Sequence, residues 1–520
     1  MERTEQRKSQ PSARRRFRFV VTACVAVAAC VVAAACTATG PGPPAFVGAP
    51  HTPVPVGDPA PPRHPYMAAT VANNMHGDSY ASDTHAAAGP LGRATEVQPA
   101  VYGALCAAQA FDSHGRLATV CGSLAGFSLK LVDPSTMAVL DSVTLPQRPS
   151  TAQAFFTGDL SKIFLDTSGG AYFYLDHRDR VVLVDADQRL RVIAIDDSGP
   201  SPRLVDEASY PLVSYLAERD CFSFPDNFAP VGRCDAITSV MPDWDGNYWW
   251  VSRYGTVGTV DPATGQVRTL QLPGEEIQNS FATAPDGVYI VSDTAMYGFR
   301  RAADGRPEVV WREPYQRSTG PRTGQVNLGS GTTPTLLGDD LVAITDGADP
   351  INVLFVDRRP SVVGDRTLCA EPVFEAGASA TDNSLIGWGT SVIAENNSGY
   401  ENLTSLVGGR SVVGGVTRVD YDPSDRTCHT VWESPVRSPS VVPKLSRAAG
   451  LAYFYAKEPQ ASGLDTWYWT AVDIRTGVIA YQVLAGTGPN FDNNWGAISI
   501  GPDGSGYVAT YDGLVRVRDP

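Results

Sequence analysis

Val132-Asp133-Pro134-Ser135-Thr136 reads as the end of a β-strand followed by a tight turn, and two close variants recur, VDPATG at 260–265 and VDIRTG at 472–477. Each copy lies between two stretches in which apolar residues alternate with polar ones. A strand that ends in such a turn and doubles back forms a β-hairpin, and hairpins that recur along a chain indicate a repeat architecture. The three copies therefore predict an all-β protein built from repeated units.

One order of strands and turns surrounds these copies from about residue 101 onward. An apolar strand meets a polar turn, such as Pro285-Asp286-Gly287 or Pro502-Asp503-Gly504, and a strongly apolar strand follows. A third strand then ends in the Val-Asp pair, and a fourth strand completes the unit. Asp-Gly turns between alternating strands favour hairpins, and four antiparallel strands per unit are typical of a β-propeller blade.

The number of blades follows from the number of third strands, because each blade contains one. Eight such ends are expected, and they are Val132, Val184, Val260, Phe299, Val356, Val419, Val472 and Val517. Because the last end lies three residues from the C-terminus, a strand from about Glu96 to Ala104 is needed to complete its blade and close the ring. We therefore expect a β-propeller of eight four-stranded blades over residues 101–520, closed by this N-terminal strand. Seven blades are the alternative, since Phe299 carries the weakest marker.

The seventh unit resembles the repeat of quinoprotein-type propellers. Residues 471–481 read AVDIRTGVIAY, which is similar to the family pattern Ala-x-Asp-x-x-Thr-Gly-x-x-x-Trp, with Tyr481 in place of the tryptophan. The resemblance implies the eight-bladed quinoprotein-like fold. Quinoprotein dehydrogenases typically stack their quinone against a disulfide between adjacent cysteines, and no two cysteines are adjacent in this chain. The resemblance therefore covers the fold without the quinone-docking cysteine pair.

The first 36 residues are expected to be an export signal. Seven of the first eighteen residues are basic, and an uncharged stretch rich in Ala and Val runs from Phe19 to Cys36. This order is typical of a signal peptide. The segments 27–30 and 33–36 both resemble the lipobox of bacterial lipoproteins, and we expect lipidation at Cys36 because a flexible segment follows it directly. An uncleaved signal anchor is the alternative, and either arrangement places the propeller outside the cytoplasm, on the outer side of the cell membrane.

Two segments separate the signal from the propeller. Residues 37–63 are rich in Pro, Gly and Ala and nearly uncharged, which is the composition of an extended tether. Residues 64–100 contain the stretch NNMHGDSYASDTH at 73–85 and are expected to form a His- and Asp-rich strap over the propeller.

The net charge limits the partners that the protein can have, and the cysteines predict disulfides. The chain carries a net charge of −14, and subtracting the +5 of its first eighteen residues leaves −19 for the rest. Such an acidic surface repels phosphate backbones and anionic lipid, so we expect no nucleic-acid partner and membrane contact only through a lipid anchor. We also expect a monomer. Six cysteines follow the signal, and export favours disulfides between them. The expected pairs are Cys106 with Cys121, Cys221 with Cys234, and Cys369 with Cys428.

Polar residues follow the second strand of several units. They include Asp293, Asp346 and Glu395 with its neighbour Asn396. Because the turns after second strands emerge on one face around the centre of a propeller, their oxygens are candidate ligands for a divalent cation, Ca²⁺ above all. The alternative is that Asp and Asn are simply the residues that turns favour.

Two further groups are candidate ligand-binding residues. His76, Asp78, Asp83 and His85 in the strap have side chains suited to a transition metal or to acid–base chemistry, or they hydrogen-bond the strap to the loops beneath it. Aromatic residues near predicted rim loops, with Asn beside them, are typical of sugar-binding sites, although aromatic residues also fill the core between blades. The candidates in this second group are Trp388, Tyr400, Asn494 and Trp495.

The chain has no GxSxG, Walker or GxGxxG motif, so serine hydrolase, nucleotide-binding and hydride-transfer functions lose their usual support. The leading hypothesis is a lipid-anchored extracytoplasmic propeller that binds a small molecule, a glycan or a protein on one face. The first alternative is a lactonase- or hydrolase-like enzyme in which Glu395, Asp346 and Asp293 hold a cation that polarises a carbonyl. The second is a quinone-dependent dehydrogenase. The sequence leaves open whether the protein is an enzyme.

Overall fold

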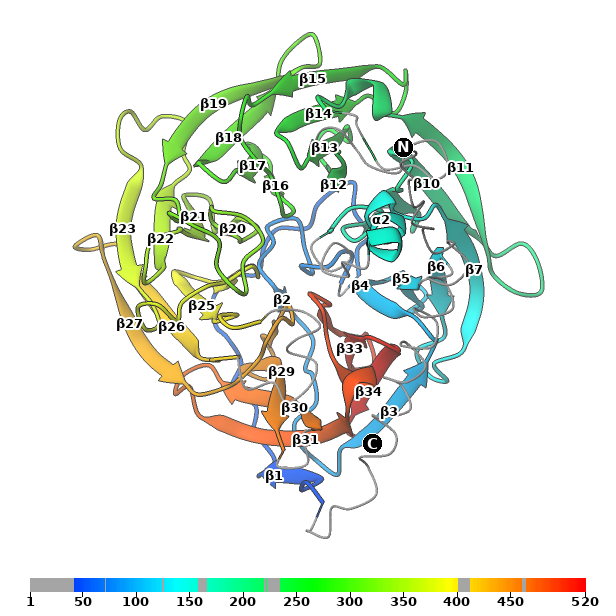
Figure 1. The fold of residues 1–520 in the computed structure, drawn as a ribbon. Coiled ribbons are helices and arrows are strands. Elements are labelled where there is room, and N and C mark those ends of the chain that lie inside the picture. Colours follow the sequence, from blue (N-terminus) through cyan, green and yellow to red (C-terminus); the bar gives the residue numbers. More distant parts are fainter. Residues whose placement is uncertain are drawn as a thin grey trace, which may run out of the picture.

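Eight β-sheets stand in a ring around one axis in the computed structural model of this chain (Figure 1). The structure describes residues 42–70, 72–123, 126–157, 166–218, 221, 234–400, 412–460 and 464–520. The ring confirms the predicted β-propeller of eight four-stranded blades. The expected signal peptide and Cys36 lie outside the described residues.

Within each blade, the first strand lies nearest the axis and the fourth lies at the outer edge. Blades one to four comprise β4 (Leu105–Phe111), β5 (Leu117–Ser123), β6 (Gly126–Val132), β7 (Val139–Leu145); β8 (Tyr174–Leu175), β9 (Val181–Val184), β10 (Arg189–Asp196), β11 (Arg203–Pro211); β12 (Ile237–Pro242), β13 (Tyr248–Ser252), β14 (Thr256–Val260), β15 (Val267–Gln271); and β16 (Ala282–Ala284), β17 (Gly287–Val291), β18 (Ala295–Arg301), β19 (Pro307–Pro314).

Blades five to eight comprise β20 (Thr335–Leu337), β21 (Leu341–Thr345), β22 (Asn352–Asp357), β23 (Thr367–Pro372); β24 (Ile386–Trp388), β25 (Ser391–Glu395), β26 (Val416–Asp422), β27 (Thr427–Ser434); β28 (Lys444–Ser446), β29 (Leu451–Pro459), β30 (Asp465–Asp473), β31 (Ile479–Thr487); and β32 (Ile498–Ile500), β33 (Gly506–Thr510), β34 (Gly513–Arg518), β3 (Glu96–Val101). Among the described residues, the α-helix α2 (Pro149–Thr157) and the short 3₁₀ helices η2 (Val213–Tyr215) and η4 (Pro489–Phe491) lie between strands. None of the described helices is long and apolar enough to cross a membrane.

The recurring Val-Asp phrase forms the turn that was expected of it. In the copy at 260–265, the Asp261 carboxylate accepts a hydrogen bond from the Ala263 amide at 2.8 Å, and the Gly265 amide donates to the Asp261 carbonyl at 2.8 Å. Gly265 has a φ of +70°, a conformation that glycine adopts without steric cost. Asp473 and Gly477 repeat this geometry in blade seven. These turns join the third strand of a blade to the fourth.

The expected N-terminal strand closes the ring. β3 pairs antiparallel with β34, so the N-terminal segment supplies the outer strand of blade eight. Glu96 lies opposite Arg518 in this pairing, and their side chains form an ion pair at 2.6 Å. The pairing covers the edge that β34 would otherwise expose.

One of the expected strand ends differs from the structure. Val184 ends β9, the second strand of blade two, and the third strand is β10. The run Val181–Val184 is fully apolar, and the Asp185 turn after it imitates the Val-Asp phrase of a third strand. The other expected ends lie in third strands: β6, β14, β18, β22, β26, β30 and β34.

The segments before the ring lie against it. β1 (Phe46–Gly48) pairs with β31 at the outer edge of blade seven, and the Phe46 ring stacks on Tyr481 at 5.9 Å. The chain from Phe46 onward therefore contacts the propeller, where the composition predicted an extended tether. The strap then passes through the middle of the ring (Figure 1), where β2 (Thr84–His85) pairs in parallel with β28 on the inside of blade seven.

The three expected disulfides are present. They join Cys106 with Cys121, Cys221 with Cys234, and Cys369 with Cys428. Disulfides form and persist in oxidising compartments, so the pairing indicates an extracytoplasmic environment.

Candidate functional site

The strap folds back on itself at the axis and brings His76 and Asp83 together. The Asp83 amide donates to the His76 carbonyl at 3.1 Å, and the Asp83 carbonyl accepts from the Leu445 amide of β28 at 2.9 Å. The side chains meet as well, with His76 Nδ1 3.2 Å from Asp83 Oδ1. Both residues are buried. The structure therefore joins two of the candidates predicted from the sequence.

Two residues of the blades complete this cluster. Lys444, the first residue of β28, places Nζ 2.7 Å from Asp83 Oδ1, and neither side chain is exposed. Ser384, which precedes β24, donates from Oγ to Asp83 and lies 3.0 Å from His76 Nδ1. Burial alone raises the pKa of Asp83, but the charges of Lys444 and His76 bring it below its ordinary value. We call His76, Asp83, Ser384 and Lys444 the axial cluster.

Burial raises the pKa of two carboxyl groups near the axis. Glu395, the last residue of β25, is buried, and this burial raises its pKa far above the ordinary value although the charge of Lys444 acts against the shift. Asp382 is also buried, which raises its pKa to about 8, while the charge of Arg253 lowers it. Carboxylic acids that stay neutral at pH 7 are able to donate a hydrogen bond or a proton.

His76 offers a second polar group to this region. Its Nε2 atom is buried and has no hydrogen-bond partner within the part of the chain that the structure describes. Its ring stacks at 5.9 Å on Tyr172, whose hydroxyl donates to Asn279 at 3.2 Å. A buried imidazole nitrogen without a partner is a group suited to acid–base chemistry.

The side chains predicted to bind a cation accept hydrogen bonds from backbone amides instead. Asp293 accepts from the Glu276 amide at 2.7 Å and pairs with Arg317, and Asp346 accepts from the Asn352 amide at 2.8 Å. Asn396 accepts from the Ser398 amide at 3.0 Å. Among the described residues, no three His, Cys, Asp or Glu side chains form a group that could hold a metal ion. The structure therefore does not bring Asp293, Asp346 and Glu395 into one such group.

The two remaining strap candidates, Asp78 and His85, have other contacts. The Asp78 carboxylate accepts from the Tyr80 amide at 2.9 Å and from the Ser82 hydroxyl, and burial raises its pKa to about 6. His85 is buried in β2, opposite Ser446 of β28.

The aromatic candidates divide into two places. Tyr400 donates to Asn494 Oδ1 at 2.8 Å, and its ring meets Trp495 edge-on at 5.4 Å, so these three residues form one group. Trp388 is buried in the core around β24, where Arg418 lies over its ring at 5.2 Å.

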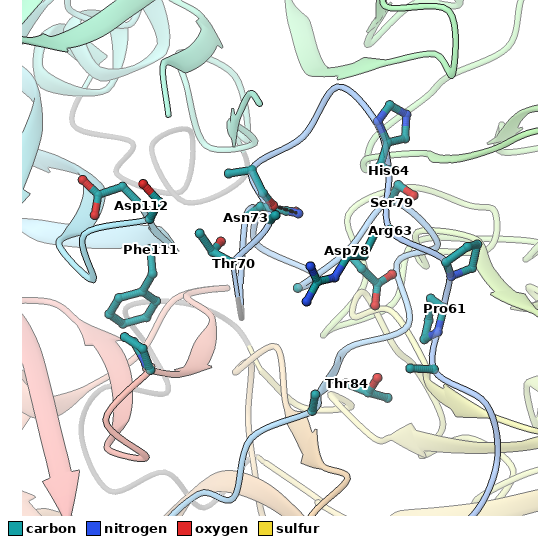
Figure 2. A pocket seen from close by; sticks show the side chains of 18 of the residues that line it. Pro61, Arg63, His64, Thr70, Asn73, Asp78, Ser79, Thr84, Phe111 and Asp112 are labelled. Atoms are coloured by element: carbon teal, nitrogen blue, oxygen red, sulfur yellow. Dashed lines mark hydrogen bonds between the residues drawn. The ribbon is translucent and has the colours of Figure 1, made fainter. Parts of the chain in front are cut away.

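A cavity of about 420 Å³ lies between the strap and the turns that join the first and second strands of blades one, seven and eight (Figure 2). It therefore opens on the face opposite to the predicted second-strand turns. Phe111, Pro61 and Pro502 form apolar parts of its wall. Its charged wall residues include Arg63 and Asp78, and the guanidinium of Arg63 makes no ion pair with any described residue.

Three polar atoms on the wall of this cavity lack partners. Thr70 Oγ1, Asn73 Oδ1 and Ser79 Oγ are buried without a hydrogen bond to any described residue. Buried polar groups in proteins almost always have partners, and those that do not are explained by a ligand or an ordered water. The cavity therefore offers a ready set of hydrogen-bonding groups.

Lys444, Ser384, Asp382 and the cavity were not predicted. Lys444 carried a signal, since it is a lone lysine within the apolar stretch VVPKLS at 441–446. A lysine in such a stretch is buried only with a partner, but the partner lies 361 positions away in the strap. The cavity left no local signal, because its wall comes from four separate segments of the chain.

Comparisons with known proteins place the fold but not the activity. No family model matches the chain. A protein described as uncharacterized from Archaeoglobus fulgidus is 29% identical over 319 residues, which cover 54% of this chain and 61% of the relative. The match thus spans less than two thirds of that relative.

Solved structures of propellers are similar as well. The quinohemoprotein alcohol dehydrogenase from Comamonas testosteroni matches with a TM-score of 0.52 and 10% identity, over 88% of this chain and 80% of that one. BamB from Moraxella catarrhalis matches with a TM-score of 0.30 and 15% identity, over 54% of this chain and 83% of that one. The likeness to the dehydrogenase, at 10% identity, supports the β-propeller fold alone.

The quinone that the resemblance to quinoprotein dehydrogenases implies does not fit the residues present in this chain. The three disulfides join cysteines that lie 15, 13 and 59 positions apart, so none of them supplies the adjacent pair against which a quinone stacks. The strap side chains His76 and Asp83 are buried at the axis. We therefore derive no chemistry through a quinone.

Proposed function

We propose that this protein is a lipid-anchored extracytoplasmic propeller that binds a small saccharide in the cavity beside the strap. The observation that carries the proposal is the set of unpartnered polar atoms, Thr70 Oγ1, Asn73 Oδ1 and Ser79 Oγ, on the wall of one cavity. Ligand sites combine an apolar wall with a few placed polar groups, in volumes of roughly 300–1,000 Å³. The cavity of about 420 Å³ has both features.

A sugar matches this wall because it presents apolar C–H faces and hydroxyl groups together. Pro61 and Pro502, which are partly exposed, offer apolar surface for a C–H face, while Thr70, Asn73 and Ser79 on the same wall carry polar groups for the hydroxyl groups of the ligand. The Arg63 guanidinium adds a donor that makes no ion pair with the described residues. Figure 2 shows these labelled side chains around the same space.

Isothermal titration of the full chain with cellobiose and with N,N′-diacetylchitobiose tests this function. We expect Ser79→Ala and Thr70→Val to weaken the binding of whichever disaccharide binds by about three- to tenfold each, the effect of one lost hydrogen bond. Ser142→Ala, on the exposed side of β7, is the matched control and leaves the affinity unchanged. Absence of binding at millimolar concentration, or equal binding by all variants, contradicts the proposal.

The region around the axial cluster supports a second candidate, a hydrolase that works by acid–base chemistry. Its basis is the pair of buried carboxyl groups with raised pKa values, Glu395 and Asp382, together with the buried His76 Nε2, which lacks a partner among the described residues. The test is the hydrolysis of δ-gluconolactone. We expect turnover that Glu395→Gln abolishes and that a calcium chelator leaves unchanged. Turnover lost with the chelator favours the cation-dependent alternative instead.

A further inference from the structure

A second buried group of ionised residues lies in blade seven, away from the axial cluster. Lys457 Nζ, on β29, is 3.0 Å from Asp465 Oδ2 on β30 and 3.6 Å from Asp492 Oδ2, just after η4. The three side chains are at most 1% exposed. One amine therefore faces two carboxyl groups with bulk water excluded.

Aromatic rings enclose this group. Lys457 Nζ lies 5.0 Å from the centre of the Trp467 ring, and Tyr455 stacks on Trp467 at 5.1 Å. Burial raises the pKa of Asp492 to about 7, while the charge of Lys457 lowers it. Asp492 is thus able to carry a proton at neutral pH. The site therefore holds the groups that an intramolecular amide bond needs. These are an amine, a carboxyl group and a second acid, held together away from water.

We propose that Lys457 and Asp465 condense into an intramolecular isopeptide bond and that Asp492 carries the proton for this step. A proton passes from the Lys457 ammonium through Asp492 to the Asp465 carboxylate, which leaves a neutral amine and a neutral acid. The Nζ lone pair attacks Cγ of Asp465 and forms the C–N bond. Asp492 takes one proton from Nζ, which keeps its last hydrogen as the amide N–H, and gives a proton to the departing hydroxyl, which leaves as water when the C–O bond breaks. No oxidant or co-reactant is consumed.

Proximity accounts for most of the expected reaction rate. Well-oriented groups within one molecule react as if at effective concentrations of about 10⁵–10⁸ M. The cross-link joins β29 to β30 at the end of their hairpin, in the blade that also holds β1 and β2. It fastens the two middle strands of a sheet whose flanking strands, β31 and β28, pair with β1 and β2.

The chain contains its own control in Lys444 and Asp83. This pair is closer, at 2.7 Å, and equally buried. Asp83, however, also accepts hydrogen bonds from Ser384 and His76, and these neighbours with Lys444 keep its pKa below the ordinary value. A carboxylate held as an anion resists attack by an amine, so this pair remains an ion pair. Distance alone therefore does not decide which pair reacts.

Tryptic mapping of the purified full chain tests the proposal. Lys457 is the one internal trypsin site between Arg447 and Arg475. A bonded lysine resists trypsin, so we expect a single peptide 448–475 that is lighter by one water. Cleavage after Lys444 proceeds normally. Separate linear peptides 448–457 and 458–475 of full mass overturn the proposal.

Two variants separate the bond from other causes of water loss. Lys457→Met removes the amine, and Asp492→Asn removes the proton carrier, so both give peptides of full mass. A cyclic imide at Asp465 also loses water, but it leaves Lys457 open to trypsin, and that result counts against the bond. Equal bond formation in Asp492→Asn overturns the role given to Asp492.

Discussion

Buried carboxyl groups near the axis are accommodated in two opposite ways. Asp83 is surrounded by a cation, an imidazole and a hydroxyl, so it is a buried anion with every partner in place. For Asp382 and Glu395, burial outweighs the nearby charges of Arg253 and Lys444 and raises the pKa instead. A buried carboxyl group must adopt one of these two solutions, because an isolated buried charge costs too much free energy. The two kinds predict different responses to mutation and to pH.

Removal of Lys444 tests the first kind. Lys444→Met leaves the Asp83 carboxylate buried without its cation, and breaking a buried pair in this way lowers the free energy of unfolding by about 3–5 kcal/mol. We expect this loss in urea unfolding followed by tryptophan fluorescence. The double variant Lys444→Met with Asp83→Asn regains part of the loss, because no charge is left behind. A double variant less stable than Lys444→Met contradicts this account.

Asp382 tests the second kind. Its pKa of about 8 in the folded protein lies above the unfolded value of about 3.9, so the folded state binds more protons between these pH values. The stabilisation is fully present below about pH 4 and is lost as the pH rises through 8. Relative to Asp382→Asn, the wild-type protein therefore loses stability from pH 5 to pH 8, by up to about 1.4 kcal/mol per pH unit. If the difference in the free energy of unfolding between the two proteins stays constant from pH 5 to pH 8, the raised pKa of Asp382 is contradicted.

At the scale of the elements, the turn phrase predicted most of the third strands, because Asp261 and Gly265 determine the turn from within a few residues. Val184 was misplaced because an apolar strand before an Asp turn has the same local pattern in the second position of a blade. β3 was predicted from topology, since a closed ring leaves no strand unpaired. What was missed depends on pairs distant in sequence, such as Lys444 with Asp83.

The closure by β3 makes a prediction about covalent locking. Glu96 and Arg518 lie opposite each other in the β3–β34 pairing. Facing residues in antiparallel strands have Cα atoms about 4.5–5.5 Å apart, which suits a disulfide. We expect the double variant Glu96→Cys with Arg518→Cys to form this bond and to raise the melting temperature of the ring.

The gain follows from the length of chain that the new bond closes, because a long closed loop restricts the unfolded chain strongly. Non-reducing peptide mapping identifies the bond. The single variants Glu96→Cys and Arg518→Cys control for the loss of the surface ion pair, which itself contributes about 0–1 kcal/mol. A double variant that forms the disulfide and melts no higher than the single variants contradicts the locking role of β3.

At the scale of the whole molecule, the N-terminal segment connects the outer edge of the ring to its axis. β1 lies on the outer edge of blade seven, the strap crosses to the axis, and β3 returns to the outer edge of blade eight (Figure 1). One segment therefore lines the cavity, supplies half of the axial cluster and closes the ring. The sequence predicted the strap and the closure, but the cavity depends on where the strap rests against three blades, which local patterns do not encode.

The same segment begins at the expected lipid anchor, which gives the last prediction. A basic head, an apolar stretch and a lipobox-like end at Cys36 predict that a fatty-acid label is incorporated into the wild-type protein and lost in Cys36→Ser. Each buried methylene group contributes about 0.8 kcal/mol, so two acyl chains suffice for stable anchoring. Cys30→Ser tests the other lipobox-like segment and retains the label. An unlabelled wild-type protein whose N-terminal peptide starts at Met1 identifies a signal anchor instead, because an uncleaved apolar stretch then holds the propeller at the membrane.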